Sequence, residues 1–370
     1  MNFSLNDDQR MLKDSVERLV ARDGGFERSG TLWARYAEIG LLALPYPSVH
    51  GGLDGTPVDT LLVFEALARA LPLEPLLPTM VIGAAALQAA SDAQLARWVP
   101  AIAAGEMSLA WAHGEAGSRY CLHDVSCVGT RDGDGWRLQG TKVLVPHGDS
   151  ADRLLLSARI AGERRDRDGI ALFMLDAHAP GMLRRSVRLH DGRRGADITL
   201  ADVRVADADV IGEPGAALPL IERIAQHAIA ALAAEGVGLM TALLDTTVDY
   251  LKTRHQFGGK IGRFQALQHR AAEMLIALEQ ARSMALYAAL MLDEPDAAER
   301  AKAMSAVKVQ IGQSARFIGQ QAIQLHGGIG VTDEYVVGHW FKRLTLMEAE
   351  FGDTDHHLAE FARSGSFIEA

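Results

Sequence analysis

The chain has 370 residues, of which 48% are hydrophobic and 23% charged, and its formal net charge is −10 at pH 7. These values are typical of a soluble globular protein of two or three domains, and the negative charge argues against a nucleic-acid-binding surface. The two cysteines, Cys121 and Cys127, provide neither a disulfide framework nor a metal-ligand spacing. We therefore expect a cytoplasmic protein without a structural metal.

The first part of the chain has the periodicity of helices. Asp7 and Asp8 lie where a secretion signal would carry basic residues, and we expect Ser4 or Asn6 to cap the first helix. Helical patterns continue to about residue 104, with Gly and Pro clusters that end helices at residues 23–25, 45–57 and 72–78. The sequence predicts an N-terminal α-helical domain over residues 1–105.

Residues 106–213 have a different rhythm, in which short apolar runs alternate with turn residues. The runs lie at residues 108–111, 136–139, 153–158, 170–175, 197–200 and 203–205. The sequence DGDG at 132–135 is a signal for a hairpin turn. This spacing predicts a small β-sandwich or barrel as the middle domain.

Residues 214–370 return to a helical pattern. Three long segments, at 218–253, 265–291 and 297–325, are expected to pack as a four-helix-type bundle. The most apolar run, 225–244, is interrupted by Gln226, His227 and Glu235. It therefore predicts a core helix rather than a membrane span.

Two polar, glycine-rich segments follow the first and third of these helices. Residues 253–265 read TRHQFGGKIGRFQ, in which Arg254 offers a planar set of donors that suits a phosphate or pyrophosphate. Residues 324–330 read QLHGGIG, residues 33–45 read WARYAEIGLLALP, and the strand-like DVRV at 202–205 precedes IGE at 211–213. With the order of helices, strands and helices, these segments resemble the acyl-CoA dehydrogenase family over nearly the whole chain.

The resemblance implies an α+β multidomain fold with an N-terminal helical domain, a central β domain and a C-terminal bundle. It implies an FAD-dependent α,β-dehydrogenation of an acyl-CoA thioester, in fatty acid or steroid side-chain catabolism, with an electron-transfer flavoprotein as acceptor. In that family FAD lies between the β domain and the bundle, and a second subunit closes the site. We expect neither a nucleic acid nor a membrane as partner.

The resemblance assigns four bundle residues to the FAD of the neighbouring subunit. Arg254 and Phe257 would reach that FAD, with Arg254 at its pyrophosphate, while Gln324 and Gly328 would lie at the adenosine end. A glycine there would let the backbone approach the ligand without a clash. The alternative role for Arg254 is a surface ion pair at a helix end.

The resemblance also assigns residues of the β domain to the flavin, but both segments depart from the family. Ser118 would point its hydroxyl to the pyrophosphate, yet residues 112–115 read AHGE where relatives usually have Thr-Glu-Pro-Gly. Val145 lies in LVP at 144–146, where relatives often have Trp-Ile-Thr. Because Pro146 lacks a backbone N–H, either His147 remakes the lost contacts or this subunit holds the flavin less tightly.

The family's catalytic base is missing from its expected position. Removal of the α-proton needs a carboxylate, but the matching position carries Phe351, and the alternative family position on the first bundle helix carries Ala228. Glu350 is the catalytic candidate, although its place in MEAE at 347–350 also fits a solvated acid on a helix face. Asp353 and Glu235 are further candidates, and Glu235 also fits a hydrogen bond within the bundle.

Three hypotheses remain for the missing base. The chain is most similar to the small subunits of heteromeric acyl-CoA dehydrogenases of the pimeloyl-CoA or steroid side-chain type, in which a homologous subunit supplies the base, as in a heterotetramer. Alternatively, a homo-oligomer uses a relocated carboxylate, or the chain is a flavin oxidase or monooxygenase on the same fold. We expect no metal at Asp353, Asp355, His356 and His357, because adjacent histidines point in different directions.

Overall fold

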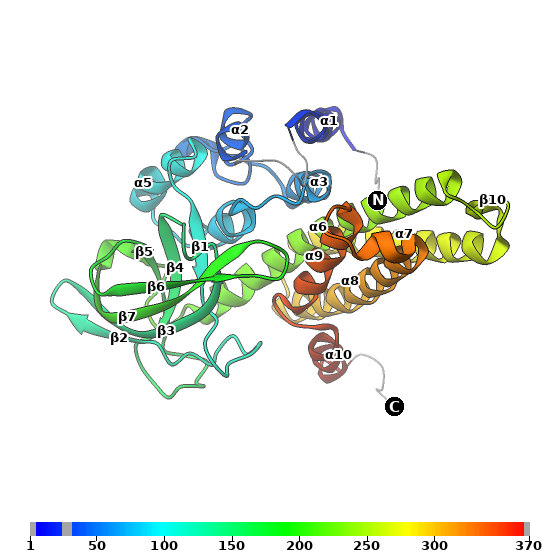
Figure 1. Ribbon diagram of the computed structural model, residues 1–370. Helices are drawn as coiled ribbons and strands as arrows, with labels where there is room; N and C mark the ends of the chain where they lie inside the picture. Colours follow the sequence, from blue (N-terminus) through cyan, green and yellow to red (C-terminus); the bar gives the residue numbers. More distant parts are fainter. Residues whose placement is uncertain (1–4, 24–31, 366–370) are drawn as a thin grey trace. The chain divides into compact units, whose positions relative to one another are not determined.

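The computed structural model describes residues 5–23 and 32–365, which form two compact units (Figure 1). One unit contains residues 57–72 and everything described from residue 229 onward, together with the first helix. The other contains residues 32–56 and 73–228. The division into domains 1–105, 106–213 and 214–370 stays a prediction, since the compact units follow spatial contacts rather than chain order.

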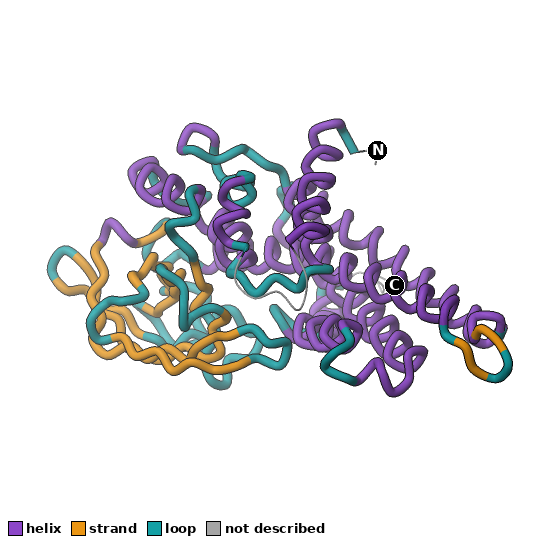
Figure 2. Tube along the Cα trace, turned by 45° about the horizontal axis from the view of Figure 1, so that its top comes forward, coloured by secondary structure: helices purple, strands orange, loops and turns teal. Residues whose placement is uncertain are grey.

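The unit that contains the β domain is built on one sheet, shown in orange in Figure 2. Within the described residues the sheet has eight strands in the order β6-β7-β3-β2-β4-β5-β8, and β1 pairs in parallel with β4. The strands are β1 Leu109–Ala112, β2 Val128–Asp132, β3 Gly135–Pro146, β4 Arg153–Arg159, β5 Ile170–Asp176, β6 Met182–Arg188, β7 Arg194–Ala206 and β8 Val210–Ile211. The predicted small β domain is thereby confirmed, as a single sheet.

The strands whose sequences are continuous apolar runs are the buried strands of this sheet. Strands β4 and β5 are buried along almost their whole length, whereas β6, at the edge of the sheet, consists of half-buried and exposed residues. A register shift interrupts the pairing of β3 and β7 between Lys142 and Val145. Short helices accompany the sheet in this unit: α2 Trp33–Glu38, α4 Ala84–Leu87 and α5 Asp92–Ala103.

The other unit is helical, and its long helices agree with the predicted segments. They are α6 Leu218–Thr253, whose first residues lie in the other unit, α7 Gln265–Met291 and α8 Ala297–His326, followed by α9 Val336–Ala349 and α10 Thr354–Arg363. Helices α1 Asp7–Asp23 and α3 Pro57–Ala68 belong to the same unit. A hairpin of β9 His255–Gln256 and β10 Gly259–Lys260 connects α6 to α7 at the end of the bundle (Figure 2).

Local signals in the sequence account for the first helix. Gln9 N donates to Asn6 Oδ1 at 2.8 Å, and Asn6 N donates to Gln9 Oε1 at 3.2 Å, so Asn6 forms a reciprocal cap. The alternative cap, Ser4, and the predicted break after Asp23 lie outside the described residues. Among the described helices only α6 is long and apolar enough to cross a membrane, and 83% of its most apolar window is buried inside the protein. It is therefore the core helix that the sequence predicts.

Candidate functional site

Arg254 lies directly after α6, at the start of the β9–β10 hairpin. Its backbone N donates to Tyr250 O at 2.8 Å, and its carbonyl accepts from Ile261 N at 2.9 Å, so the backbone is fixed on both sides. The side chain is exposed and makes no ion pair or side-chain hydrogen bond within the part of the chain that the structure describes. The geometry therefore does not support the alternative role of a surface ion pair and leaves the guanidinium available to an external anion.

Gln324 and Gly328 lie at the end of α8, and both are exposed. The preceding Gly327 has φ +65°, a conformation that favours glycine, whereas a Cβ added to Gly328 would meet no atom of this chain within 4 Å. Neither the backbone nor the packing of this chain demands glycine at 328. The space beside it is open to an external group.

His326 connects these two segments, a role that sequence reasoning missed. Its ring centroid lies 4.5 Å from that of Tyr250 on α6 and 5.2 Å from that of Tyr335. Its Nδ1 lies 2.8 Å from Ala322 O, and burial lowers its pKa. The aromatic contact holds the end of α8 beside the end of α6, so the segments of Arg254 and Gly328 share one end of the bundle.

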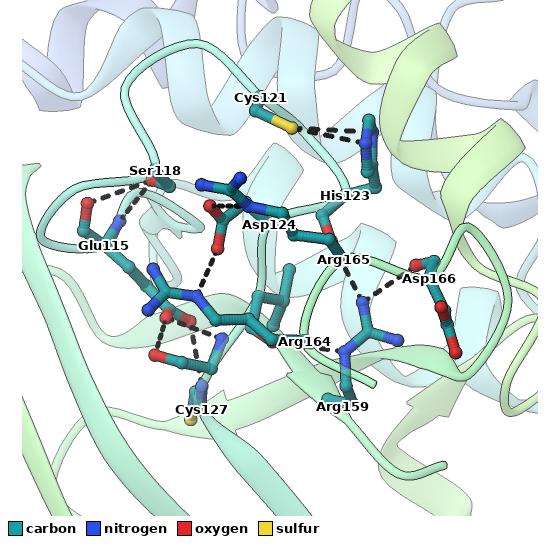
Figure 3. Close-up of polar contacts among 12 residues, drawn as sticks. Glu115, Ser118, Cys121, His123, Asp124, Cys127, Arg159, Arg164, Arg165 and Asp166 are labelled. Atoms are coloured by element: carbon teal, nitrogen blue, oxygen red, sulfur yellow. Dashed lines mark hydrogen bonds and ion pairs between the residues drawn. The ribbon is translucent and has the colours of Figure 1, made fainter. Parts of the chain in front are cut away.

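The β-domain residues predicted to contact flavin are less available. The buried Ser118 hydroxyl donates to Glu115 O at 2.9 Å and accepts from Glu115 N at 3.2 Å, closing its own turn (Figure 3). Val145 is buried in β3, and the buried His147 has φ +59° and donates its backbone N–H to Arg194 O at 2.9 Å. Leu144, next to Val145, is exposed and also has a positive φ of 50°.

A buried ion pair lies next to the Ser118 turn. Lys142 Nζ is 2.6 Å from Glu115 Oε1, and the side chains are 0% and 2% exposed. Lys142 also donates to His113 O at 3.2 Å and to Ser157 Oγ at 3.1 Å. Burial raises the pKa of Glu115, but Lys142 and the other donors outweigh this effect and the net shift is downward. The charges are thus compensated inside the domain.

Arg159 fixes the two loops beside this ion pair (Figure 3). Its guanidinium donates to five backbone carbonyls at 2.8–3.3 Å, those of His123, Val125, Ala161, Asp166 and Asp168. In return the buried Asp124 accepts from Arg164 and Arg165, the latter at 3.0 Å. The charged residues 164–168 are exposed, and through Arg159 and Asp124 they are joined to the segment that follows Ser118.

The catalytic candidates in the bundle converge on one guanidinium. Arg343 on α9 is buried, and its Nε and Nη2 contact the two Glu235 oxygens at 2.6 and 2.8 Å. Its Nη1 contacts Glu350 Oε1 at 2.9 Å. The interpretation of Glu350 as a solvated acid is therefore wrong, because only 17% of its side chain is exposed, whereas the predicted hydrogen bonding of Glu235 within the bundle is confirmed.

The turn after α9, where the resemblance predicts the catalytic base, is held from several sides. Lys308 Nζ donates to Met347 O, Glu348 O and Glu350 O at 3.2, 3.0 and 2.8 Å, and burial lowers its pKa to about 8. Phe351 follows with φ +58°, and its carbonyl lies 2.8 Å from His357 Nε2. Neither Phe351 nor the buried Ala228 provides an acid.

The remaining candidates have structural contacts as well. The Asp353 carboxylate accepts from His356 N at 2.8 Å and caps α10. His357 Nδ1 lies 3.2 Å from Ser305 Oγ, so both of its ring nitrogens lie beside polar groups. Among the described residues no group of three or more His, Cys, Asp or Glu side chains is arranged to hold a metal.

Comparison with known proteins identifies the family. A model of the acyl-CoA dehydrogenase C-terminal domain matches residues 219–365, and one of the N-terminal domain matches residues 6–106. The chain belongs to the acyl-CoA dehydrogenase family. Acyl-CoA dehydrogenase FadE12 of Mycobacterium tuberculosis is 30% identical over 351 residues, which cover 91% of this chain and 90% of that protein. The protein is therefore an oxidoreductase of the acyl-CoA dehydrogenase type.

Solved structures of this family have the same fold. A variant of the Tcur3481-Tcur3483 steroid ACAD has a TM-score of 0.86 at 28% identity, and the match covers 98% of both chains. Butyryl-CoA dehydrogenase from Megasphaera elsdenii has a TM-score of 0.91 at 21% identity, with coverage of 98% of this chain and 99% of that chain. The predicted acyl-CoA dehydrogenase fold is confirmed.

Replacing Lys142 with Met should destabilise the β domain strongly, because Glu115 would keep a buried charge without its main partner. We expect a loss of about 3–5 kcal/mol in the free energy of unfolding, measured by urea denaturation. As a control, Arg185→Met removes the exposed partner of Asp197 and should cost less than about 1 kcal/mol. Equal losses in the two variants would contradict this account.

The stability of the protein should depend on the protonation of His357. Burial lowers its pKa from 6.5 to about 4, so the unfolded chain binds more protons between these values. Stability is therefore lost as the pH falls from about 6.5 towards 4. The midpoint of thermal unfolding should fall less between pH 7 and pH 5 in His357→Gln than in the wild type. The exposed His190, replaced by Gln, should leave the pH dependence unchanged.

Proposed function

We propose that this chain binds FAD with its bundle edge and acts in acyl-CoA dehydrogenation as one subunit of a heteromeric enzyme whose homologous subunit supplies the base. The observation that carries the proposal is the neutralisation of Glu235 and Glu350 by the buried Arg343. A general base must reach its substrate with a free lone pair, and both carboxylates instead face the guanidinium. Phe351 has no proton-accepting group.

The availability of the bundle residues supports binding of FAD at this end. Arg254 presents an exposed guanidinium whose planar donors suit a pyrophosphate. The open space at Gly328 permits close approach of a ligand to the backbone, and Gln324 is exposed beside it. These residues fit the diphosphate and the adenosine of the cofactor, which when bound would accept the hydride from the β-carbon of the substrate.

The β domain fits the flavin less well, which supports a division of labour between unlike subunits. Ser118 uses its hydroxyl within its own turn, and Pro146 has no N–H to offer. One solved structure that is 28% identical to this chain is the Tcur3481-Tcur3483 steroid ACAD. Its name contains two protein designations, as expected for an enzyme of two unlike subunits. We further propose an acyl-CoA of the fatty acid or steroid side-chain type as substrate, an electron-transfer flavoprotein as acceptor, and a cytoplasmic location.

Co-expression with a homologous acyl-CoA dehydrogenase chain of the same organism tests this function. The two chains should co-purify with bound FAD, and a panel of acyl-CoA thioesters should bleach the visible absorbance of the flavin. This chain alone should bleach weakly or not at all, because it lacks the base. Strong bleaching by the isolated chain would contradict the heteromeric proposal and favour a homo-oligomer with a relocated base.

Replacing either acid bound to Arg343 should leave the chemistry of the assembled enzyme nearly intact. We expect Glu350→Gln and Glu235→Gln to keep kcat within about two-fold of the wild type, whereas loss of a true general base lowers the rate by about 10²–10⁴-fold. Both variants should lower the thermal stability, since each removes a partner of a buried guanidinium. A loss of kcat by two orders of magnitude at unchanged stability would identify that acid as the base.

Replacing Arg254 should weaken the retention of FAD. Loss of charge-assisted hydrogen bonds in Arg254→Ala should raise the Kd of FAD by about 10–100-fold. Arg254→Lys should have an intermediate effect, because lysine keeps the charge but not the planar fork. The control is Lys252→Met, which removes another exposed cation near the end of α6. Equal FAD affinity in Arg254→Ala and the wild type would contradict the assignment.

A further inference from the structure

The turn of the β9–β10 hairpin places an aromatic residue in an unfavourable conformation. Gln256 pairs with Gly259, so Phe257 and Gly258 form the turn between them. Their φ values are +52° and +77°, as in a type I′ turn, where Asn-Gly is preferred and a bulky first residue is strained. Phe257 is nevertheless 83% exposed, so its side chain gains little from burial. Strain of this kind at an exposed side chain indicates a functional requirement.

Arg263 holds this turn in place. Its Nη2 donates to Phe257 O at 2.9 Å, and its guanidinium carbon lies 5.2 Å from the centroid of the Phe264 ring. The Phe264 ring in turn meets the Phe257 ring edge to face, with centroids 6.2 Å apart. A single guanidinium therefore contacts the turn backbone and the aromatic ring that supports Phe257.

Gly259 provides the space that this arrangement needs. A Cβ at Gly259 would lie 2.7 Å from Arg263 Nη1 and 3.0 Å from its Cζ. Any larger residue would displace the guanidinium from its position against the hairpin. The glycine after the turn and the arginine four residues later thus form one structural unit.

We infer that Arg263 is a positioning residue, which presents the ring of Phe257 to the FAD held by a neighbouring subunit. This inference rests on the proposed function. The two arginines of the segment have different roles: Arg254 keeps its guanidinium available for the anionic ligand, whereas Arg263 directs its guanidinium at its own hairpin. Arg263 therefore acts through Phe257 and not by touching the cofactor.

Hydrogen exchange of the full-length chain without FAD tests the positioning. Arg263→Ala should accelerate the exchange of backbone amides in residues 255–260, and Arg263→Lys, which retains a donor, should restore part of the protection. The control is Arg270→Ala, which removes an exposed arginine of α7 outside the hairpin. Unchanged exchange of the hairpin in Arg263→Ala would overturn the inference.

A double-mutant cycle in the assembly that retains FAD tests the connection with Phe257. Arg263→Ala should accelerate the release of FAD by about 3–10-fold, the loss expected for one hydrogen bond, and Arg270→Ala should not. In a Phe257→Ala background, Arg263→Ala should cause no further acceleration. Independent, additive effects would show that Arg263 contacts the ligand directly and would overturn the inference.

The two measurements separate this inference from the proposed function. An assembly of wild-type chains without FAD would contradict the proposed function and with it the role of Phe257 towards the cofactor. The hydrogen exchange of the hairpin does not depend on FAD, so it decides by itself whether Arg263 holds the turn.

Discussion

The proposed function of this chain depends on one interaction, the pairing of Arg343 with Glu235 and Glu350. A buried guanidinium without partners would be costly, and two carboxylates with close contacts compensate it. The nearby Lys308 caps the end of α9 and adds a second positive charge. The cluster therefore joins α6, α8 and α9 around the turn at Phe351.

This pairing has a chemical consequence, because it directs both carboxylates at a guanidinium of their own chain. The dehydrogenase reaction needs a base with a free lone pair near the α-carbon. The same contacts that stabilise the bundle direct Glu235 and Glu350 at Arg343, and Phe351, at the position where the resemblance predicts the base, has no acid. The chain has the architecture of acyl-CoA dehydrogenases, and these contacts are the basis of the proposal that a homologous subunit supplies the base.

The polar interior of the β domain follows the same principle. Glu115 and Lys142 neutralise each other, and Arg159 directs all of its donors to loop carbonyls. These groups hold the loops in place and leave little polar capacity for a ligand. The bundle end differs, since Arg254 and Phe257 are exposed and have few contacts with their own chain. The contrast supports a subunit that contributes an edge to a site largely held by a neighbour.

The sequence by itself determined the elements and the family. The bounds of α6 and α7 are those that the apolar periodicity predicts, and α8 ends one residue later than predicted. The agreement is close because the periodicity of a helix is a local property of the sequence. The ordered motifs around Arg254 and Gly328 carried the resemblance. Only the tertiary structure showed that Arg343 binds Glu235 and Glu350. Glu235 and Arg343 are separated by 108 positions in the sequence, and no local pattern reveals a pairing over that distance. The sheet order, the contact of His326 with Tyr250 and the compensation of Lys142 by Glu115 were likewise set by packing, because burial selects partners by position in space.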